Sequence, residues 1–305
     1  MKHKILDIPN ERSSHTIPTP RGGGLAIVIT WYVGISIIYF VGSLDKGLYF
    51  ALLSGCILAI VSILDDLFDI KPYIRLTFQI LSAVLAYLFL GGLLPFNILG
   101  FDLSSKMLLF IFVILGILWF INIYNFLDGI DGYASVEAII VSIVLYFFSG
   151  NIITLILIAS VSGFLIWNWP KAKIFMGDIG STQLGFILVV LGVYLHNQTH
   201  LSIIHWIMLS SLFWFDATLT LYRRWRNKET LTKAHKKHAY QRIVQSGFSH
   251  NKTLLVSILI NMVIIGFVYL SQVYSILLIP LFIINLLFLY FITRLIDNRL
   301  PFGKS

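Results

Sequence analysis

The stretch MLLFIFVILGILWFINIYNFLDGIDG, Met107–Gly132, decides the fold class of this chain. It begins with an apolar run, and about 18 to 20 such residues cross the hydrocarbon core of a bilayer as a helix. The stretch then places Asn122, Asn125, Asp128 and Asp131 at intervals of three. Polar groups are costly at that depth. The stretch therefore predicts a membrane helix that ends in a functional polar segment.

Composition extends this prediction to the whole chain. Hydrophobic residues make up 58% of its 305 positions and charged residues only 12%, which is typical of proteins with several membrane spans. We therefore predict an all-α, polytopic membrane helix bundle that forms a single domain over residues 1–305. Apolar runs indicate about ten spans, of which the seventh is the shortest: residues 24–42, 47–64, 76–95, 106–124, 133–149, 152–168, 183–196, 201–222, 253–271 and 274–293.

The basic residues predict the orientation of the bundle. With ten spans, twenty of the twenty-two Lys and Arg residues lie on one side, and positive charge is retained on the cytoplasmic side of a membrane. Both termini and every loop rich in Asp, His, Asn and Gly are then cytoplasmic. The loop at residues 223–252 is the most basic, with nine Lys or Arg against Glu229. It is suited to anionic headgroups or an anionic soluble substrate, or it serves only as a topology signal.

The segment SILDDLFDIKPYIRLTFQ carries carboxylates at the cytoplasmic end of the second span. Asp65 and Asp66 are adjacent, and Lys71 and Arg75 follow them. Adjacent carboxylates repel each other, so their presence indicates a cation or a neighbouring base. Mg²⁺ uses one or two protein carboxylates and takes its other ligands from water and phosphates. A solvated cluster paired with Lys71 and Arg75 is the alternative.

The polar end of the opening stretch has two interpretations. Its glycines indicate that the helix ends near Asp128 and that the chain then turns tightly. Asn125, Asp128 and Asp131 together have the groups to hold a metal, a sugar hydroxyl or the edge of a uracil ring. A capped helix end with an Asp-Gly turn is the alternative, and it leaves Asn122 unexplained.

Three further cytoplasmic segments carry candidate residues. In KIFMGDIGSTQLGF, Asp178 lies between two glycines, which lets a metal or phosphate approach the backbone; a capping turn is the alternative. In KAHKKHAYQR, we expect His235, His238 and Arg242 to contact phosphate oxygens, against the alternative of a solvated basic loop. In NERSSHTIPTPRGGG, Arg21 adds a donor for an anion beside the first span.

Two acidic residues lie inside predicted spans. Asp216 is in the eighth span, so it is a functional candidate unless it pairs with Arg223 or Arg224. Glu137 in the fifth span is a weaker candidate of the same kind.

Together and in this order, five of these segments resemble one family. They are DIPNERSSHTIPTPRGGG, DDLFDIKP with the RL and Q that follow, NIYNFLDGIDG, FMGDIGS and HKKHAYQR, and they extend over residues 7–242. The sequence resembles the polyprenyl-phosphate N-acetylhexosamine-1-phosphate transferases. That membrane family starts bacterial O-antigen, teichoic-acid and related polymers and includes the peptidoglycan phospho-N-acetylmuramoyl-pentapeptide transferase.

The resemblance implies an enzyme of the bacterial inner membrane with its active site on the cytoplasmic face. Such an enzyme transfers a sugar 1-phosphate from a UDP-sugar to undecaprenyl phosphate, releases UMP and requires Mg²⁺, or Mn²⁺ in its place. The implied residues fall into three groups: Asp65, Asp66, Asp128 and Asp131 in catalysis; Asp178 at the metal; and Asn125, Lys71, Arg75, His235, His238, Arg242 and Arg21 at the substrates.

The motifs also suggest a subgroup. RSSH..PTPRGGG with H..H.YQR is most similar to the O-antigen-initiating members, some of which prefer 6-deoxy-amino sugars such as N-acetylfucosamine or N-acetylquinovosamine. The late motif lacks the histidine-rich form of the peptidoglycan enzyme, which argues against a muramoyl-pentapeptide donor. Family members usually have a further span before the first motif, and only six residues precede Asp7. We therefore expect either an upstream start or a chain without that helix. We also expect a homodimer and no nucleic-acid partner.

Other function classes fit the pattern less well. An intramembrane prenyltransferase would also use DDxxD with Mg²⁺, but it should show a second Asp-rich repeat of similar form. A CDP-alcohol phosphotransferase would continue DGIDG into an Ala-Arg pair, and YASVEAII follows instead. A transporter or flippase for an anionic lipid or solute would place its ionisable groups near the bilayer midplane, whereas here they lie at one interface.

Overall fold

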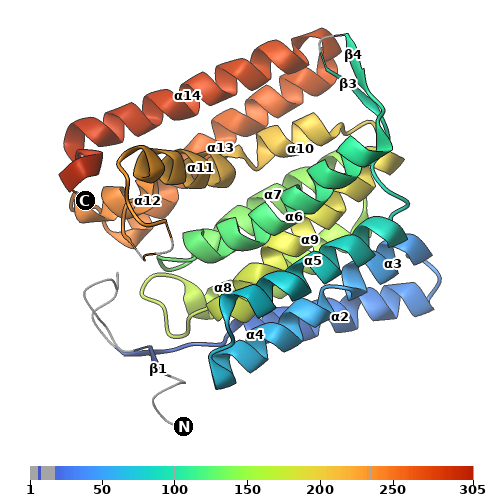
Figure 1. Ribbon diagram of the computed structural model, residues 1–305, viewed down its shortest axis with the longest axis horizontal. Helices are drawn as coiled ribbons and strands as arrows, with labels where there is room; N and C mark the ends of the chain where they lie inside the picture. The colour runs from blue at the N-terminus through green and yellow to red at the C-terminus, as the bar shows by residue number, and fades with distance from the viewer. Residues whose placement is uncertain (1–5, 8–17, 99, 232, 234, 305) are drawn as a thin grey trace.

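The computed structural model describes residues 6–7, 18–98, 100–231, 233 and 235–304, and within these ranges α-helices dominate (Figure 1). The all-α prediction is confirmed. The helices are α2 (Gly24–Phe40), α3 (Lys46–Leu53), α4 (Cys56–Phe68), α5 (Pro72–Phe89), α6 (Lys106–Leu127), α7 (Tyr133–Ser149), α8 (Ile152–Asn168), α9 (Gly177–Gln198), α10 (Ile203–Leu209), α11 (Ser211–Arg226), α12 (Ala239–Gln245), α13 (His250–Val273) and α14 (Leu278–Arg299), with 3₁₀ turns η1 (Ser275–Leu277) and η2 (Phe302–Lys304).

The helices have the length and composition of a multi-pass membrane protein. Among the described residues, six helical segments are long and apolar enough to cross a bilayer: Lys46–Asp66, Pro72–Phe89, Lys106–Leu127, Gly177–Gln198, His250–Val273 and Ser275–Arg299. The pair α10 and α11 makes a seventh if it is one bent span, while α2, α7 and α8 are apolar but have only 17 residues each. These segments coincide with the predicted spans, but the count of ten is not confirmed.

The seventh predicted span has wrong boundaries. It is not the short segment 183–196 but the 22-residue helix α9, which starts at Gly177. Glycine, Ser and Thr in its first turns predicted a loop, but here they permit close packing against neighbouring helices. An added Cβ on Gly185 would lie 2.3 Å from the Phe120 carbonyl oxygen of α6. This packing makes α9 the central helix, with 89% of its apolar window buried.

One other predicted span differs from the structure. The span predicted at residues 201–222 is broken at Ser210, where α10 and α11 meet at 72°. The connection between the third and fourth predicted spans forms a hairpin of β3 (Phe96–Ile98) and β4 (Phe101–Leu103). The two-residue strands β1 (Leu6–Asp7) and β2 (Thr19–Pro20) form a second antiparallel pair.

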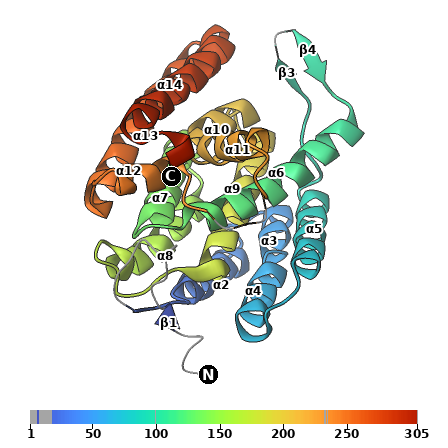
Figure 2. The same cartoon turned by 60° about the vertical axis from the view of Figure 1, so that its left-hand side comes forward.

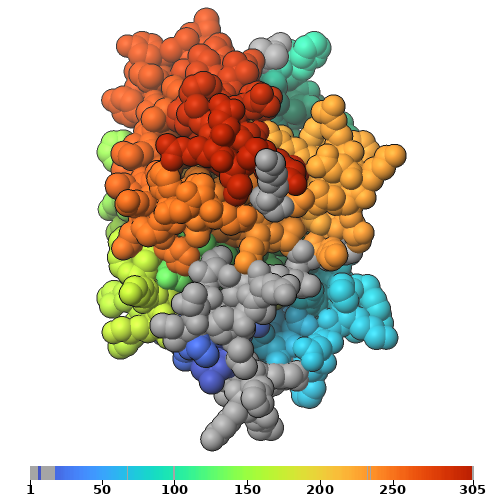
Figure 3. All heavy atoms as spheres, turned by 90° about the vertical axis from the view of Figure 1, so that its left-hand side faces the viewer, coloured from blue at the N-terminus to red at the C-terminus, as the bar shows by residue number. Residues whose placement is uncertain are grey.

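The helices run side by side around α9, with α2 to α5 on one flank and α13 and α14 on the other (Figures 1 and 2). The β3–β4 hairpin marks one end of the bundle. We call the opposite end the basic end; there the described connections at residues 69–71, 128–132, 169–176, 227–231 and 235–238 meet. Figure 3 faces this end, with the C-terminal helices (orange to red) above and the segments around the end of α4 (cyan) and of α8 (yellow-green) below. The predicted site residues lie here.

Candidate functional site

Three carboxylates from two helices form what we call the carboxylate cluster: Asp65 and Asp66 in the last turn of α4, and Asp178 in the first turn of α9. The end of α4 holds Asp65 in place, because its Oδ1 accepts a hydrogen bond from the backbone N–H of Ile70 at 2.8 Å. That bond requires the chain to reverse at Asp69, whose φ of 52° is left-handed. Aspartate is one of the few residue types that tolerates this conformation.

Two arginines bridge the carboxylate cluster. The Arg75 guanidinium lies 2.7 Å from Asp65 Oδ2 and 3.8 Å from Asp178 Oδ2. The Arg21 guanidinium lies 3.4 Å from Asp66 Oδ1 and 3.6 Å from Asp178 Oδ1. Each arginine thus joins Asp178 to one member of the α4 pair. Among the described residues, three carboxylates thus share two guanidinium groups.

The backbone brings Arg21 and Asp178 together. Arg21 pairs with Phe175 in a parallel bridge, and the N–H of Phe175 donates to the carbonyl of Pro20 at 2.8 Å. Just beyond, α2 and α9 start against each other: a Cβ on Gly24 would lie 2.4 Å from Gly180 Cα. Only glycine permits this approach, so the RGGG and GDIG segments are matched in shape as well as in charge.

A cavity of about 280 Å³ opens beside the carboxylate cluster. Asp65, Arg75 and Asp178 line it together with Asn125 and Asn122 of α6. The amide of Asn125 donates to Ser181 Oγ at 3.4 Å. The amide of Asn122 donates to the Leu118 carbonyl at 2.7 Å and is 3.3 Å from Gln79 Oε1. Asn122 is therefore part of the cavity wall as well as a packing residue.

The donor set fits a hard divalent cation only in an open site. Within the described ranges, no three His, Cys, Asp or Glu side chains are placed to enclose a metal ion. Mg²⁺, however, needs only one or two protein carboxylates and completes its shell with water and substrate phosphates. Asp178 with Asp65 or Asp66 provides such a pair at the cavity.

Asp128 lies just past the end of α6, at the turn that follows it. Burial, with the nearby Asp178 carboxylate as a second cause, raises the pKa of Asp128 well above its usual value, although Arg21 opposes this. Asp178 of α9 and Arg21 are thus the members of the site that influence the charge of Asp128.

Asp131 has a partner that the sequence did not reveal. Its side chain is only 10% exposed, and its Oδ2 lies 3.1 Å from Nδ1 of His250 and 3.2 Å from the N–H of Ala172. His250 is the first residue of α13, behind the N-cap Ser249. The sequence offered one signal for this partner, a histidine at the cytoplasmic start of a predicted helix.

The late histidines form a separate, packed group around α12. The rings of His235 and His238 are 4.9 Å apart, and His238 stacks on Tyr240 at 6.0 Å. His238 is 3% exposed, with its Nδ1 3.8 Å from Asp216 Oδ1. Burial, followed by the positive charge of its neighbours, lowers the pKa of His235 to about 4. Neither histidine lines the 280 Å³ cavity.

The group around α12 reaches the candidate site through Tyr240. The Tyr240 hydroxyl donates to the Phe126 carbonyl at 3.2 Å, and it would lie 2.1 Å from a Cβ placed on Gly129. The hydroxyl thus rests on the turn that carries Asp128. Burial raises the pKa of Tyr240 well above its usual value, so it remains a neutral donor.

Two arginines of the basic loop are built into the fold. Arg224 is 2% exposed, bonds Glu229 at 3.2 Å and donates to three carbonyls of residues 230–233. Arg242 is 1% exposed and donates to Asp297 at 2.6 Å and to the Leu300 carbonyl at 3.0 Å. Residues 223–252 are therefore not one open loop, since α12 and these two buried cations organise them.

The alternative that Asp216 pairs with Arg223 or Arg224 is wrong. Asp216 instead accepts from the N–H of Ala239 at 2.8 Å and from Thr220 at 3.1 Å, capping α12. Arg223 pairs instead with Asp297, and Arg242 pairs with the same carboxylate. Glu137 is buried and accepts from Asn261 at 2.6 Å.

The remaining predicted residues lie away from the cavity or outside the described residues. Lys71 is exposed at the N-cap of α5, with its Nζ 5.9 Å from the Tyr73 ring, and does not line the cavity. Of the segment NERSSHTIPTPRGGG, the part before Pro18 lies outside the described residues. The structure thus brings Asp65, Asp66, Asp178, Arg21, Arg75, Asn125 and Asp128 together, and it places Asp131, His235, His238 and Arg242 in packed groups behind them.

Known proteins are similar to this chain in sequence. The sequence model described as glycosyl transferase family 4 matches residues 48–196. A Bacillus subtilis (strain 168) protein named "Probable undecaprenyl-phosphate N-acetylglucosaminyl 1-phosphate transferase" is 32% identical in an alignment 282 residues long, which covers 86% of this chain and 76% of that protein.

Two other groups of relatives match as well. The decaprenyl-phosphate N-acetylglucosaminephosphotransferase of Mycobacterium leprae (strain TN) is 26% identical over 81% of this chain and 72% of its own length. The phospho-N-acetylmuramoyl-pentapeptide-transferase of a Streptococcus gordonii strain is 32% identical over 61% of this chain and 63% of its own.

Proposed function

Because the chain belongs to glycosyl transferase family 4, we propose that it transfers an N-acetylhexosamine 1-phosphate from a UDP-sugar to a polyprenyl phosphate. The observation that carries this proposal is the carboxylate cluster, bridged by Arg21 and Arg75 beside an open cavity of about 280 Å³. The names of the Bacillus and Mycobacterium relatives support a polyprenyl-phosphate acceptor and an N-acetylglucosamine donor.

The proposed reaction exchanges one phosphoanhydride bond for another. An oxygen of the acceptor phosphate forms a bond to the β-phosphorus of the UDP-sugar, and the bond from that phosphorus to the bridging oxygen breaks. UMP leaves with the electron pair. Phosphoryl transfer between anions depends on positioning and charge neutralisation more than on covalent help. Arg21 and Arg75 supply fixed positive charge at the cavity, and Asn125 supplies an amide for a polar substrate group.

A divalent cation, Mg²⁺ or Mn²⁺, completes the proposal. Asp178, with Asp65 or Asp66, would hold it, and when bound it neutralises phosphate charge and orients the diphosphate. Asp65 keeps a firm position through Ile70 and Arg75, so it is suited to orient the acceptor phosphate. Asp128, whose pKa is raised, is suited to donate a hydrogen bond to the nucleotide sugar.

The finer parts of the proposal concern place and pathway. We propose that the basic end faces the cytoplasm of a bacterial inner membrane, where a nucleotide sugar is available, and that the product starts an O-antigen or related envelope polymer. Undecaprenyl phosphate is the proposed acceptor. N-acetylglucosamine is the donor that the relatives support, and a 6-deoxy-amino sugar is the narrower alternative from the motifs. A homodimer remains part of the proposal.

The test is UMP release by the purified protein with undecaprenyl phosphate, a panel of UDP-sugars and Mg²⁺. Asp178→Asn and Asp65→Asn should each lower the rate at least a hundredfold, by analogy with the removal of one preorganised electrostatic contact, about 10²–10³. Asp69→Asn is the matched control, because it removes a carboxylate from the same connection and asparagine tolerates the φ of 52°. No UMP with any donor, or full rates in both site variants, would refute the proposal.

A further inference from the structure

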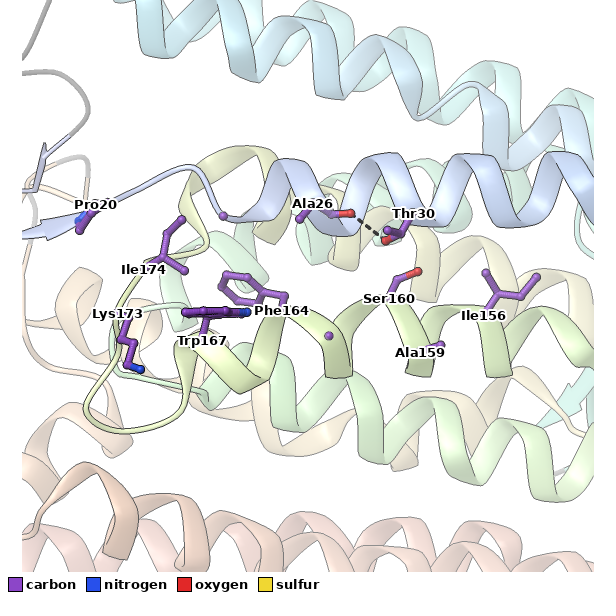
Figure 4. A pocket seen from close by; sticks show the side chains of 12 residues that line it. Pro20, Ala26, Thr30, Ile156, Ala159, Ser160, Phe164, Trp167, Lys173 and Ile174 are labelled. Atoms are coloured by element: carbon purple, nitrogen blue, oxygen red, sulfur yellow. Dashed lines mark hydrogen bonds between the residues drawn. The ribbon is translucent and has the colours of Figure 1, made fainter.

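A second cavity, which we call the α2–α8 groove, lies between those helices (Figure 4). Its volume is about 790 Å³. Small residues make room for it, namely Ala26 on α2 with Ala159 and Gly163 on α8, and Ile156 and Phe164 give it an apolar wall. An added Cβ on Gly163 would meet no atom within 4 Å. The groove is therefore open space of hydrocarbon character along two apolar helices.

The basic end of the groove carries positive charge. Lys173 is the one charged residue among the described residues that line it. Its ammonium lies 5.4 Å from the centroid of the Trp167 ring, a cation–π distance. Figure 4 shows both side chains at the same end of the groove. Tryptophan and lysine together are typical of the headgroup level of a membrane.

We propose that the α2–α8 groove binds an acyl chain of an anionic phospholipid, with the lipid phosphate at Lys173. The apolar walls match the chain, and the charge of Lys173 favours an anionic headgroup over a zwitterionic one. Basic pockets between membrane helices are known to select anionic lipids. This inference does not depend on the transferase proposal, since it concerns a bilayer lipid and not a substrate.

The polyprenyl phosphate is a poorer occupant of this groove. Its phosphate must reach the carboxylate cluster, and the 280 Å³ cavity beside that cluster has apolar walls of its own in Leu58, Val61 and Leu76. The two cavities share no lining residue.

A lipid in the groove would brace the candidate site from outside. Ile174 lines the groove, and the next residue, Phe175, pairs with Arg21 and bonds Pro20. The chain continues from there into Asp178 of α9. The lipid would thus pack against the connection that holds Arg21 and Asp178 together.

Native mass spectrometry of the purified chain in mixed micelles tests this inference. The micelles contain equal amounts of phosphatidylglycerol and phosphatidylcholine. The unchanged protein should retain phosphatidylglycerol with a preference of about fivefold, the factor that about 1 kcal/mol for one lysine near the surface corresponds to. Lys173→Gln should bring the preference close to one. Lys171→Gln, in the same connection but outside the groove, should keep it.

Filling the groove gives an independent readout. Gly163→Leu should remove most of the retained lipid, whereas Gly266→Leu on α13, where an added Cβ also meets no atom within 4 Å, should not. Equal loss of preference in Lys171→Gln and Lys173→Gln would overturn the inference, as would unchanged retention in Gly163→Leu. Stoichiometric displacement of phosphatidylglycerol by undecaprenyl phosphate would also overturn it, because the groove would then belong to the acceptor.

Discussion

Replacing Asp297 by alanine should destabilise the protein strongly, because two arginines share this carboxylate. Arg223 donates two hydrogen bonds to it, of 3.0 and 3.1 Å, and Arg242 donates one of 2.6 Å. Arg242 is 1% exposed, so the variant leaves a buried guanidinium without its counter-charge. Breaking a buried ion pair costs about 3–5 kcal/mol. At about 2 °C per kcal/mol for a chain of this size, Tm should fall by about 6–10 °C.

The assay is thermal unfolding of the purified protein in detergent, followed by tryptophan fluorescence. Arg294→Gln is the control, since Arg294 is an exposed charge on the same helix, one turn before Asp297, and its loss should cost less than about 0.5 kcal/mol. Adding Arg242→Met to Asp297→Ala should recover part of the lost stability, because the uncompensated charge is then removed. A Tm within 2 °C of the unchanged protein for Asp297→Ala, or strictly additive losses in the double variant, would refute the reasoning.

Three further variants probe the packed groups behind the cavity. Gly129→Ala should lower UMP release, because its Cβ would lie 2.1 Å from the Tyr240 hydroxyl, and adding Tyr240→Phe should restore part of the rate. His250→Ala should cost about 1–3 kcal/mol by leaving buried Asp131 short of a partner, measured as a lower Tm, while His250→Gln keeps a donor and should cost less. His235, with a pKa of about 4, stays neutral while the unfolded chain takes up its proton. Stability should therefore fall as pH drops from 6.5 towards 4, and the fall in Tm should be shallower in His235→Gln.

The sequence was sufficient for the class of fold and for the expectation that the candidate residues gather at one end of the bundle. The composition of a segment, apolar or rich in Lys and Arg, reflects whether lipid or water surrounds it. This environment can therefore be inferred from the segment alone. The boundaries of α9 were missed because its first turns, from Gly177, read as a loop. Their small residues are explained by contact with Gly24 and Phe120, which are distant in sequence. Close helix packing cannot be inferred from one helix alone.

The candidate site divides in the same way. Asp65, Asp66, Asp178 and Asn125 were expected at one membrane face, and their convergence follows from that topology. The sequence could not distinguish buried basic residues from exposed ones, because the buried Arg242 and the exposed Lys71 carry the same charge. What distinguishes Arg242 is its contact with Asp297 of α14, a residue that no motif marked. The partner of Asp131, His250, was missed for the same reason.

The charge balance of the carboxylate cluster gives the physical case for a metal. Among the described residues, two guanidinium groups, those of Arg21 and Arg75, are shared by three carboxylates, and burial, with the Asp178 charge as the second cause, raises the pKa of Asp128. A substrate diphosphate would add more negative charge to the same place. The two guanidinium groups cannot neutralise both the carboxylates and the phosphates. A divalent cation shared between Asp178 and the diphosphate would remove that deficit, which is why we expect substrate binding and cation binding to be mutually dependent at this site.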